Sequence, residues 1–512
     1  MNVWRATGLI AFANAAALGL QFLTTVLIAR EFGTRAEMDA YTLAVSIPES
    51  LQYLLMLATL SVLFTPLWID ARARLGESEA WSMALSLLLF LTVIVIALLP
   101  LLFFLMPFGM QWLAPGFPES TRALAVELSN LILPGLIYYA TAGILLGICY
   151  AHHDFRVAAL NTILLAALNL AAFFVFVQWW NGGVRGLMIG RLSVLACAEI
   201  FLLWGALRHA RGIAWRVQLF HPEFRALFRY MPPYMFGALS GQLALVINRA
   251  FVSTLGAGSV AAWGYGQRLA DIPLAVIGAA FGTTFLPDFA AHIAANEKDN
   301  ASASWQRAIL RVCFTLTPIA ALLIALAAPL IALAFQRGAF DTASTQASAL
   351  VLMGLAVGLP LRGVAGLVVR GMPAFKTRAL PLVLSALSTA TNIILDVILI
   401  VPFGLFGIAL AASIGDALFA IVGTIVFWRW MNTRAHATLA ALGKILLASL
   451  LAGALSALTV PALESLAPFV QVTLSGMIGV LFFVVLAFWF DLGEMRAGIQ
   501  FVQQRILKKA RS

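Results

Sequence analysis

The chain has 512 residues, of which 62% are hydrophobic and only 11% charged, and its formal net charge is +10. A mean hydropathy of +0.97 excludes an ordinary water-soluble globular protein, because most of such a chain has to be buried in an apolar solvent such as the lipid bilayer. The three cysteines lie in or beside apolar runs and have the spacing of neither a disulfide framework nor a metal site.

Apolar runs separated by polar residues predict an all-α polytopic membrane protein of about fourteen transmembrane helices. None of the runs shows the period-two alternation of membrane strands. The first run continues to Ala29, so we predict that it is kept as a helix and not cleaved as a signal peptide. The predicted spans are 8–29, 38–66, 81–107, 123–149, 157–179, 187–207, 232–253, 260–287, 312–335, 346–369, 379–401, 405–428, 445–463 and 469–490.

Lysine and arginine predict the orientation of these spans in a bacterial inner membrane. With a cytoplasmic N-terminus, most of the 32 lysines and arginines fall in cytoplasmic segments, and an even number of spans places both termini there. This bias, with attraction to anionic lipid, accounts for the positive charge without nucleic-acid binding. The basic segment 208–231 is predicted to be an interfacial helix. The outside loops hold only Arg30, Arg35, Arg122, Arg185 and Arg337.

Local similarities recur within the chain at an offset of about 222 residues, which indicates an internal repeat. Residues 61–66 match 282–287, 114–117 match 337–340, 154–156 match 376–378, and Gly33 matches Gly256. A repeat of this length contains six spans, so both copies have the same orientation. We therefore predict an N-terminal lobe over 1–220, a C-terminal lobe over 221–430, and a helix pair with a basic tail over 431–512.

Arginines inside the predicted spans are candidates for substrate binding, because a charge in the bilayer is costly and commonly functional. Arg249, Arg268 and Arg362 would attract an anion such as phosphate or pyrophosphate, whose oxygens match the donors of a guanidinium. The alternative is that each arginine pairs with an acid and holds helices together; the acids available are Asp271, Asp396 and Asp416. Arg191 lies near a span end, where we expect it to snorkel.

Asn392 and Asp396 stand four residues apart and so share one helix face, which suggests a coupling site for sodium or a proton. Asn248 and Ser413 could complete the site; the alternative is an ion pair between Asp396 and an arginine. Asp39 and Gln52, with Gln21 and Glu49, form either a substrate-facing wall or a hydrogen-bond network between helices. No other cofactor is expected.

Enzymatic activity is not expected. The sequence contains no glycine-rich phosphate loop, nucleophile elbow or HExxH motif, and no loop is long enough to form a separate catalytic domain.

A series of short motifs, in order along the chain, resembles the MurJ (MviN) family of lipid II flippases within the multidrug/oligosaccharidyl-lipid/polysaccharide exporter superfamily. The motifs are residues 29–33 with 39–41, 47–48, 64–66, 113–117, Arg268-Leu269 with Pro273, 282–287 and 335–340. The resemblance implies fourteen helices in two lobes plus a C-terminal pair. It also implies alternating access that moves an undecaprenyl-pyrophosphate-linked saccharide to the periplasmic leaflet through a cationic cavity.

The resemblance assigns Arg268 to the eighth-helix arginine of the family and Asp39 to its acidic position after the first helix. Asn248, Asn392 and Asp396 correspond to positions of sodium ligands. The first lobe departs from the family, because Leu18, Thr24 and Gln52 stand where arginines are usual. The expected substrate is therefore lipid II or, alternatively, another lipid-linked envelope glycan or exopolysaccharide precursor. A scaffold of envelope synthesis that transports nothing also stays open, and protein partners are not predicted.

Overall fold

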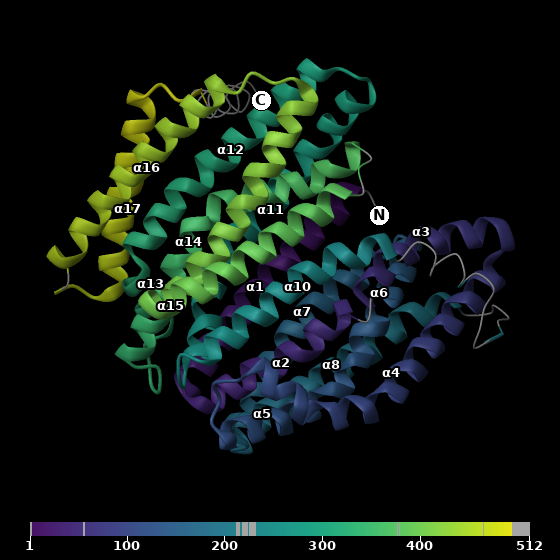
Figure 1. Cartoon of the computed structure of the whole chain (residues 1–512). Helices are drawn as coiled ribbons and strands as arrows, with labels where there is room; N and C mark the ends of the chain where they lie inside the picture. Colours follow the sequence, from purple (N-terminus) through teal and green to yellow (C-terminus); the bar gives the residue numbers. More distant parts are fainter. Residues whose placement is uncertain are drawn as a thin grey trace, which may run out of the picture. The chain divides into compact units, whose positions relative to one another are not determined.

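The computed structural model describes residues 3–54, 57–210, 216–217, 224, 232–375, 377, 379–463 and 465–493 (Figure 1). Every regular element in these ranges is helical, which confirms the all-α prediction. The chain forms two compact units, one of residues 1–261 with 337–340 and one of residues 262–336 with 341–512. Most of the predicted interfacial helix at 208–231 lies outside the described residues.

The first unit is built from helices that pack pairwise: α1 against α7, α3 against α6, α2 against α5, and α8 against both α6 and α7. Helix α11 begins at the end of this unit and continues into the second. The helices are α1 (Val3–Phe32), α2 (Ala36–Leu54), α3 (Leu57–Leu75), α4 (Glu77–Leu113), α5 (Glu119–Ile132), α6 (Leu136–Ala151), α7 (Phe155–Ala172), α8 (Gly183–Leu207), α10 (Pro232–Ser253) and α11 (Ser259–Ala294). Short 3₁₀ or π segments are η1 (Leu133–Gly135), η2 (Phe173–Trp179) and η3 (Arg208–Ala210).

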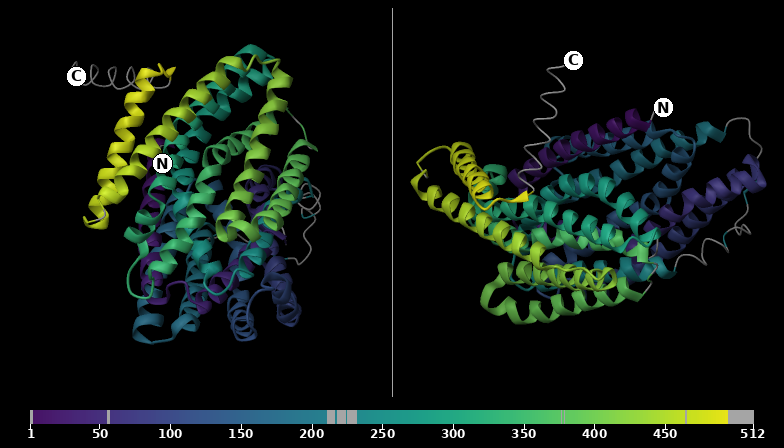
Figure 2. Two further views of the ribbon diagram at one scale, coloured as in Figure 1. Left: turned by 60° about the vertical axis from the view of Figure 1, so that its left-hand side comes forward. Right: turned by 90° about the horizontal axis from the view of Figure 1, so that it is seen from above.

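The second unit has a core of buried aromatic side chains, in which Trp305 lies 4.8 Å from Phe427 and 5.6 Å from Phe289 between ring centroids. Helices α14 and α15 pack extensively, and α12 packs on α14 and α16. The neighbouring α16 and α17, drawn in yellow-green to yellow, lie side by side in both ribbon views (Figure 2). The helices are α12 (Lys298–Ala325), α13 (Ala327–Phe335), α14 (Thr342–Gly371), η4 (Met372–Phe375), α15 (Ala379–Met431), α16 (His436–Ala462) and α17 (Pro468–Trp489).

Helix α15 contains two of the predicted spans, which meet at a kink. Gly404 adopts φ 53° and ψ −129° there, which breaks the helical path next to Pro402. A positive φ of this kind is accessible to glycine because it has no Cβ. The boundary between the two predicted spans, at 401–405, therefore falls at the corner where two helical stretches of α15 meet.

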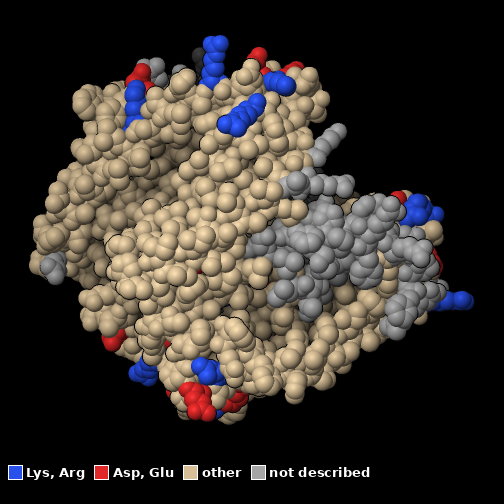
Figure 3. All heavy atoms as spheres, viewed as in Figure 1, with Lys and Arg blue, Asp and Glu red and all other residues tan. Residues whose placement is uncertain are grey.

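The helices have the length and composition of membrane spans. Within the described residues, ten helical segments are long and apolar enough to cross a bilayer, and the last of the ten runs from Pro468 to Trp489. Most of the visible surface carries neither Lys or Arg nor Asp or Glu (Figure 3). The chain is therefore a multi-pass membrane protein, while the total of fourteen spans stays a prediction.

Candidate functional site

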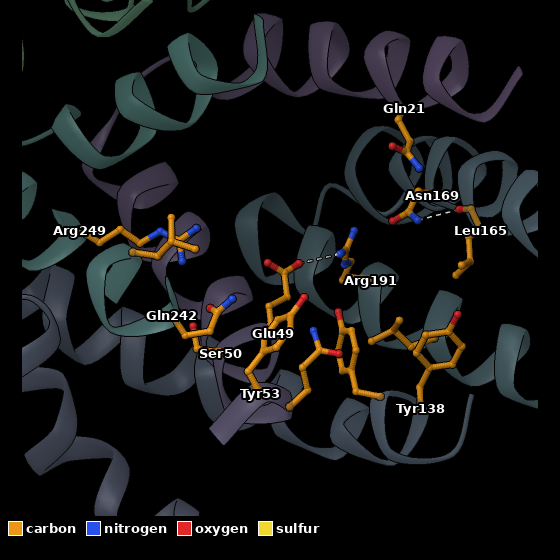
Figure 4. A pocket seen from close by; sticks show the side chains of 14 residues that line it. Gln21, Glu49, Ser50, Tyr53, Tyr138, Leu165, Asn169, Arg191, Gln242 and Arg249 are labelled. Carbon is orange, nitrogen blue, oxygen red and sulfur yellow. Dashed lines mark hydrogen bonds and ion pairs between the residues drawn. The ribbon is translucent and has the colours of Figure 1, made fainter. Parts of the chain in front are cut away.

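A polar cavity of about 470 Å³ lies within the first unit, among helices α1, α2, α6, α7, α8 and α10 (Figure 4). Two arginines, one glutamate, several amides and three tyrosines make up most of its lining. The described lining residues are Gln21, Glu49, Ser50, Gln52, Tyr53, Tyr138, Tyr139, Leu165, Asn169, Arg191, Leu195, Gln242, Leu245 and Arg249.

The cavity has an excess of positive charge. Arg191 of α8 donates to Glu49 of α2, with 3.3 Å between Nη2 and Oε1 (Figure 4). Arg249 of α10 makes no ion pair with a described residue, and Glu49 is the only acidic residue among the described lining residues. The lining therefore holds two guanidinium groups and one carboxylate, and that carboxylate pairs with Arg191, which leaves the donors of Arg249 available to an anionic ligand.

Amide and hydroxyl groups surround these arginines. Gln21, Gln52 and Gln242 come from three different helices, and Asn169 donates to the Leu165 carbonyl at 2.7 Å. Such groups both donate and accept hydrogen bonds, so they suit a hydroxyl-rich ligand such as a sugar. Gln52, predicted to bind substrate, lies in this lining.

A smaller apolar chamber of about 150 Å³ adjoins the polar cavity. Leu43, Leu51 and Leu113 are among its walls. The two spaces share Ser50, Gln242 and Arg249. Arg249 therefore stands where a polar surface meets an apolar one, the arrangement that an amphiphilic anion requires.

Asp39 is a candidate for the substrate-facing wall, but in the structure its carboxylate accepts hydrogen bonds from backbone N–H groups. Its carboxylate accepts hydrogen bonds from the Gly258 N–H at 2.5 Å and from the Ala261 N–H at 2.7 Å, at the start of α11. The side chain is 1% exposed and is not among the described lining residues. A carboxylate at a helix N-terminus satisfies N–H groups that the helix leaves unpaired. The structure thus favours the hydrogen-bond alternative for Asp39.

Arg362 of α14 lies between two acidic residues in the second unit. Its Nη1 is 3.0 Å from the Asp271 carboxylate, and its Nε is 3.2 Å from that of Asp416. This is the pairing that the sequence suggested as the alternative to substrate binding. Arg268, one turn before Asp271 on α11, is exposed and belongs to the same unit.

The candidate ion-coupling residues are all buried, and they belong to two different units. Asn392 and Asp396 face each other on α15, with 3.4 Å between Nδ2 and Oδ1, and Asp396 is 0% exposed. Ser413 donates to the Gly354 carbonyl at 2.7 Å. Asn248 is 4% exposed and belongs to the first unit. Among the described residues, no group of three or more His, Cys, Asp or Glu side chains could hold a metal ion.

Arg191 is a cavity residue that sequence reasoning assigned to the membrane surface. It stands eight positions after Gly183, the first residue of α8, and its side chain turns inward to Glu49. An acid and a base in different spans of one lobe were visible in the sequence as a pair of opposite charges. Their separation of 142 residues concealed the contact.

Over most of its length, the chain is similar in sequence to one family of known proteins. The family model "Lipid II flippase MurJ" matches residues 28–484. The probable lipid II flippase MurJ of Rhizobium tropici is 27% identical over 441 residues, which cover 82% of this chain and 81% of that protein. The lipid II flippase MurJ of Burkholderia cenocepacia is 29% identical over 360 residues, with 65% and 66% covered.

The fold also matches solved structures. A lipid II flippase MurJ in an inward closed conformation superposes with a TM-score of 0.78 at 21% identity, covering 94% of this chain and 99% of that one. An inward-facing multidrug resistance transporter of the MATE family, from the MOP superfamily, gives a TM-score of 0.69 at 17% identity, with 82% and 94% covered.

Proposed function

The chain belongs to the lipid II flippase MurJ family, whose members are transporters and not enzymes, and we propose that it moves lipid II across the bacterial inner membrane. In this proposal the undecaprenyl-pyrophosphate-linked saccharide enters from the cytoplasmic leaflet and leaves in the periplasmic leaflet by alternating access. Both termini are cytoplasmic, as the distribution of arginine and lysine predicts.

The excess of positive charge in the polar cavity is the observation that carries this proposal. Lipid II joins an anionic pyrophosphate to a sugar and to an apolar chain. Arg249 offers donors to the pyrophosphate, while the amides around it suit the saccharide. Arg191 and Arg249 supply, from α8 and α10, the positive charge that the resemblance leads one to expect at positions 18, 24 and 52.

Transport against a gradient requires coupling to an ion, and the Asn392–Asp396 pair is the site we propose for it. A buried carboxylate with an amide on the same helix face offers oxygen ligands of the kind that sodium prefers, and it can equally take up a proton. An ion shifts the equilibrium between inward and outward states only if it binds one of them more tightly.

Another lipid-linked envelope glycan is the alternative substrate. The observation that favours it is that Leu18, Thr24 and Gln52 replace the usual arginines. Moving the cationic groups to α8 and α10 changes the shape of the cavity around the headgroup. A different saccharide on the same pyrophosphate carrier would use the same cations.

The test is chemical labelling of the lipid II headgroup at the outer face of cells depleted of their resident flippase. We expect expression of this protein to restore labelling, and Arg268→Ala to abolish it with the protein still folded and inserted. Arg185→Ala is the matched control, because Arg185 pairs with Glu127 outside the described cavity lining.

The outcomes separate the candidates. Restored labelling that Arg268→Ala removes supports lipid II transport. Absence of labelling from well-expressed protein rejects lipid II and points to the other glycans. Labelling that persists in Arg268→Ala shows that this arginine is dispensable.

A further inference from the structure

A further acid, Glu199, lies half-buried within a membrane-spanning helix of the first unit. Glu199 is on α8 and contacts Thr141 of α6, with 2.6 Å between Glu199 Oε1 and Thr141 Oγ1. The Thr141 side chain is 2% exposed. No motif or comparison assigns a function to either residue.

If Glu199 is ionised, the Thr141 hydroxyl has only one proton for two neighbouring oxygen atoms. Thr141 Oγ1 lies 2.7 Å from the Ile137 carbonyl oxygen and 2.6 Å from Glu199 Oε1. A hydroxyl has a single proton to donate, and neither a carbonyl nor a carboxylate can donate one. With one proton for each hydrogen bond, both contacts form together when Glu199 is protonated and donates to Thr141, which donates to Ile137.

The second carboxyl oxygen supports the same protonation state. Glu199 Oε2 is buried and has no hydrogen-bond partner in the described part of the chain. An ionised carboxylate in such a place would lack both water and a counter-charge, which is costly in a membrane interior. A neutral acid avoids that cost.

The charged and titratable groups on α8 and on the helices packed against it make contacts with residues other than Glu199. Arg191, on the same helix, pairs with Glu49 of α2, and Glu127 of α5 pairs with Arg185 at the start of α8. On α6, the Tyr138 hydroxyl accepts from Asn161 of α7 at 3.4 Å. Further along α8 and η3, Arg208 and His209 contact Asp154. None of these contacts supplies a counter-charge to Glu199.

The position of Glu199 connects it to the polar cavity. Arg191, Leu195 and Glu199 follow one another at intervals of four residues on α8, so they lie along one helix face. The first two line the cavity. Tyr138, one turn before Thr141 on α6, lines it as well. A change in the α6–α8 contact therefore acts on the walls of the cavity directly.

We propose that Glu199 is a proton-binding site of the transport cycle, with Thr141 as its hydrogen-bond partner. In the protonated state Glu199 donates to Thr141, which donates to the Ile137 carbonyl. When the O–H bond of Glu199 breaks, the proton passes to water, and the Thr141 hydroxyl turns from the Ile137 carbonyl to the carboxylate. Because one hydroxyl cannot replace the water that an ionised carboxylate needs, proton release then favours a state in which the α6–α8 contact opens and water reaches the carboxylate.

Infrared spectroscopy tests the proton site without any lipid substrate. Full-length protein in lipid nanodiscs is titrated with pH, and the C=O stretch of protonated carboxyl groups is recorded. We expect a band that titrates and that disappears in Glu199→Gln, whose amide keeps the donor to Thr141. The band should shift in Thr141→Val, which removes the acceptor, and stay unchanged in Glu127→Gln, the exposed control acid.

Two results would overturn the proposal. A spectrum identical in wild type and Glu199→Gln shows that Glu199 is ionised throughout. A Glu199 band that is insensitive to pH shows a fixed structural acid.

A transport measurement adds the functional test, and this part rests on the proposed function. In liposomes containing lipid II, the wild-type rate should depend on pH by up to about tenfold per unit, the limit for one proton. Glu199→Gln should be slow and independent of pH. A wild-type pH profile retained in Glu199→Gln rejects the coupling role. A titrating infrared band without lipid II transport would leave the proton site standing and reject lipid II as substrate.

Discussion

Arg249 and Arg362 are both arginines within helices of a membrane protein, yet the net charge of the groups around them differs in sign. Arg249 lines a cavity with polar walls in which the one described acid, Glu49, pairs with Arg191. Arg362 is held between two aspartates, at 3.0 and 3.2 Å. The first arrangement has a cation to spare and the second an anion. Counting charges around each arginine thus separates a site that can bind an anion from one that holds helices together.

Among the residues of this comparison, the largest effect is expected for Arg249→Ala, which should reduce binding and transport of the pyrophosphate-linked substrate by roughly 10- to 150-fold. This is the value of one hydrogen bond to a charged group, about 1.5–3 kcal/mol. Arg249→Lys keeps the charge but loses the fork of donors, so it should recover only part of the activity. Substrate binding to purified protein and the transport rate measure the change.

The melting temperature of the Arg249 variants serves as the control and should be unchanged or higher, because no acidic partner is left unpaired. A drop as large as that of Arg362→Ala would contradict the comparison.

A smaller effect, on stability, is expected for Arg362→Ala. Removing the cation leaves Asp271 and Asp416 facing each other, which should cost about 2 kcal/mol. This is less than the 3–5 kcal/mol of a fully buried pair, because the side chains of both aspartates are 43% exposed. Thermal unfolding in detergent measures the loss.

The double variant Arg362→Ala with Asp416→Asn should recover part of that stability, since it removes the repulsion. If Asp416→Asn brings no recovery, electrostatic attraction between Arg362 and the two aspartates is not what stabilises this contact.

The smallest effect is expected for substitutions of Asp39. This acid accepts hydrogen bonds from backbone N–H groups and is not paired with an arginine in the described contacts. Asp39→Ala leaves the N–H groups of Gly258 and Ala261 without their acceptor, at a cost of about 1–2 kcal/mol. Asp39→Asn retains one acceptor oxygen and should lose less. Thermal unfolding measures both variants, and the substrate affinity of the folded protein should not change. A loss of affinity with stability intact would return Asp39 to the substrate site.

The fold class could be predicted from the sequence because transmembrane helices are determined locally. A run of apolar residues long enough to cross the bilayer leaves few other structures open to the backbone. The corner of α15 lies at the break between the predicted spans, 401–405. The sequence shows where helices begin and end but not whether they continue through a bend.

The site was predicted only in part, because its contacts join residues far apart in the chain. Arg249 and Gln52 were identified as polar groups in apolar runs, and both line the cavity. The inward turn of Arg191 depends on Glu49, 142 residues away, and the binding of Asp39 depends on N–H groups more than 200 residues away. Periodicity within one helix carries no information about such partners.

The corner at Gly404 makes one position of the chain sensitive to chirality. Its angles, φ 53° and ψ −129°, are the mirror image of an extended conformation that L-residues adopt readily. Apart from the adjoining backbone, a Cβ at this position would meet no atom within 4 Å, so the backbone angles themselves disfavour an L-residue. D-alanine would fit the corner without strain, whereas L-alanine of the same size would not.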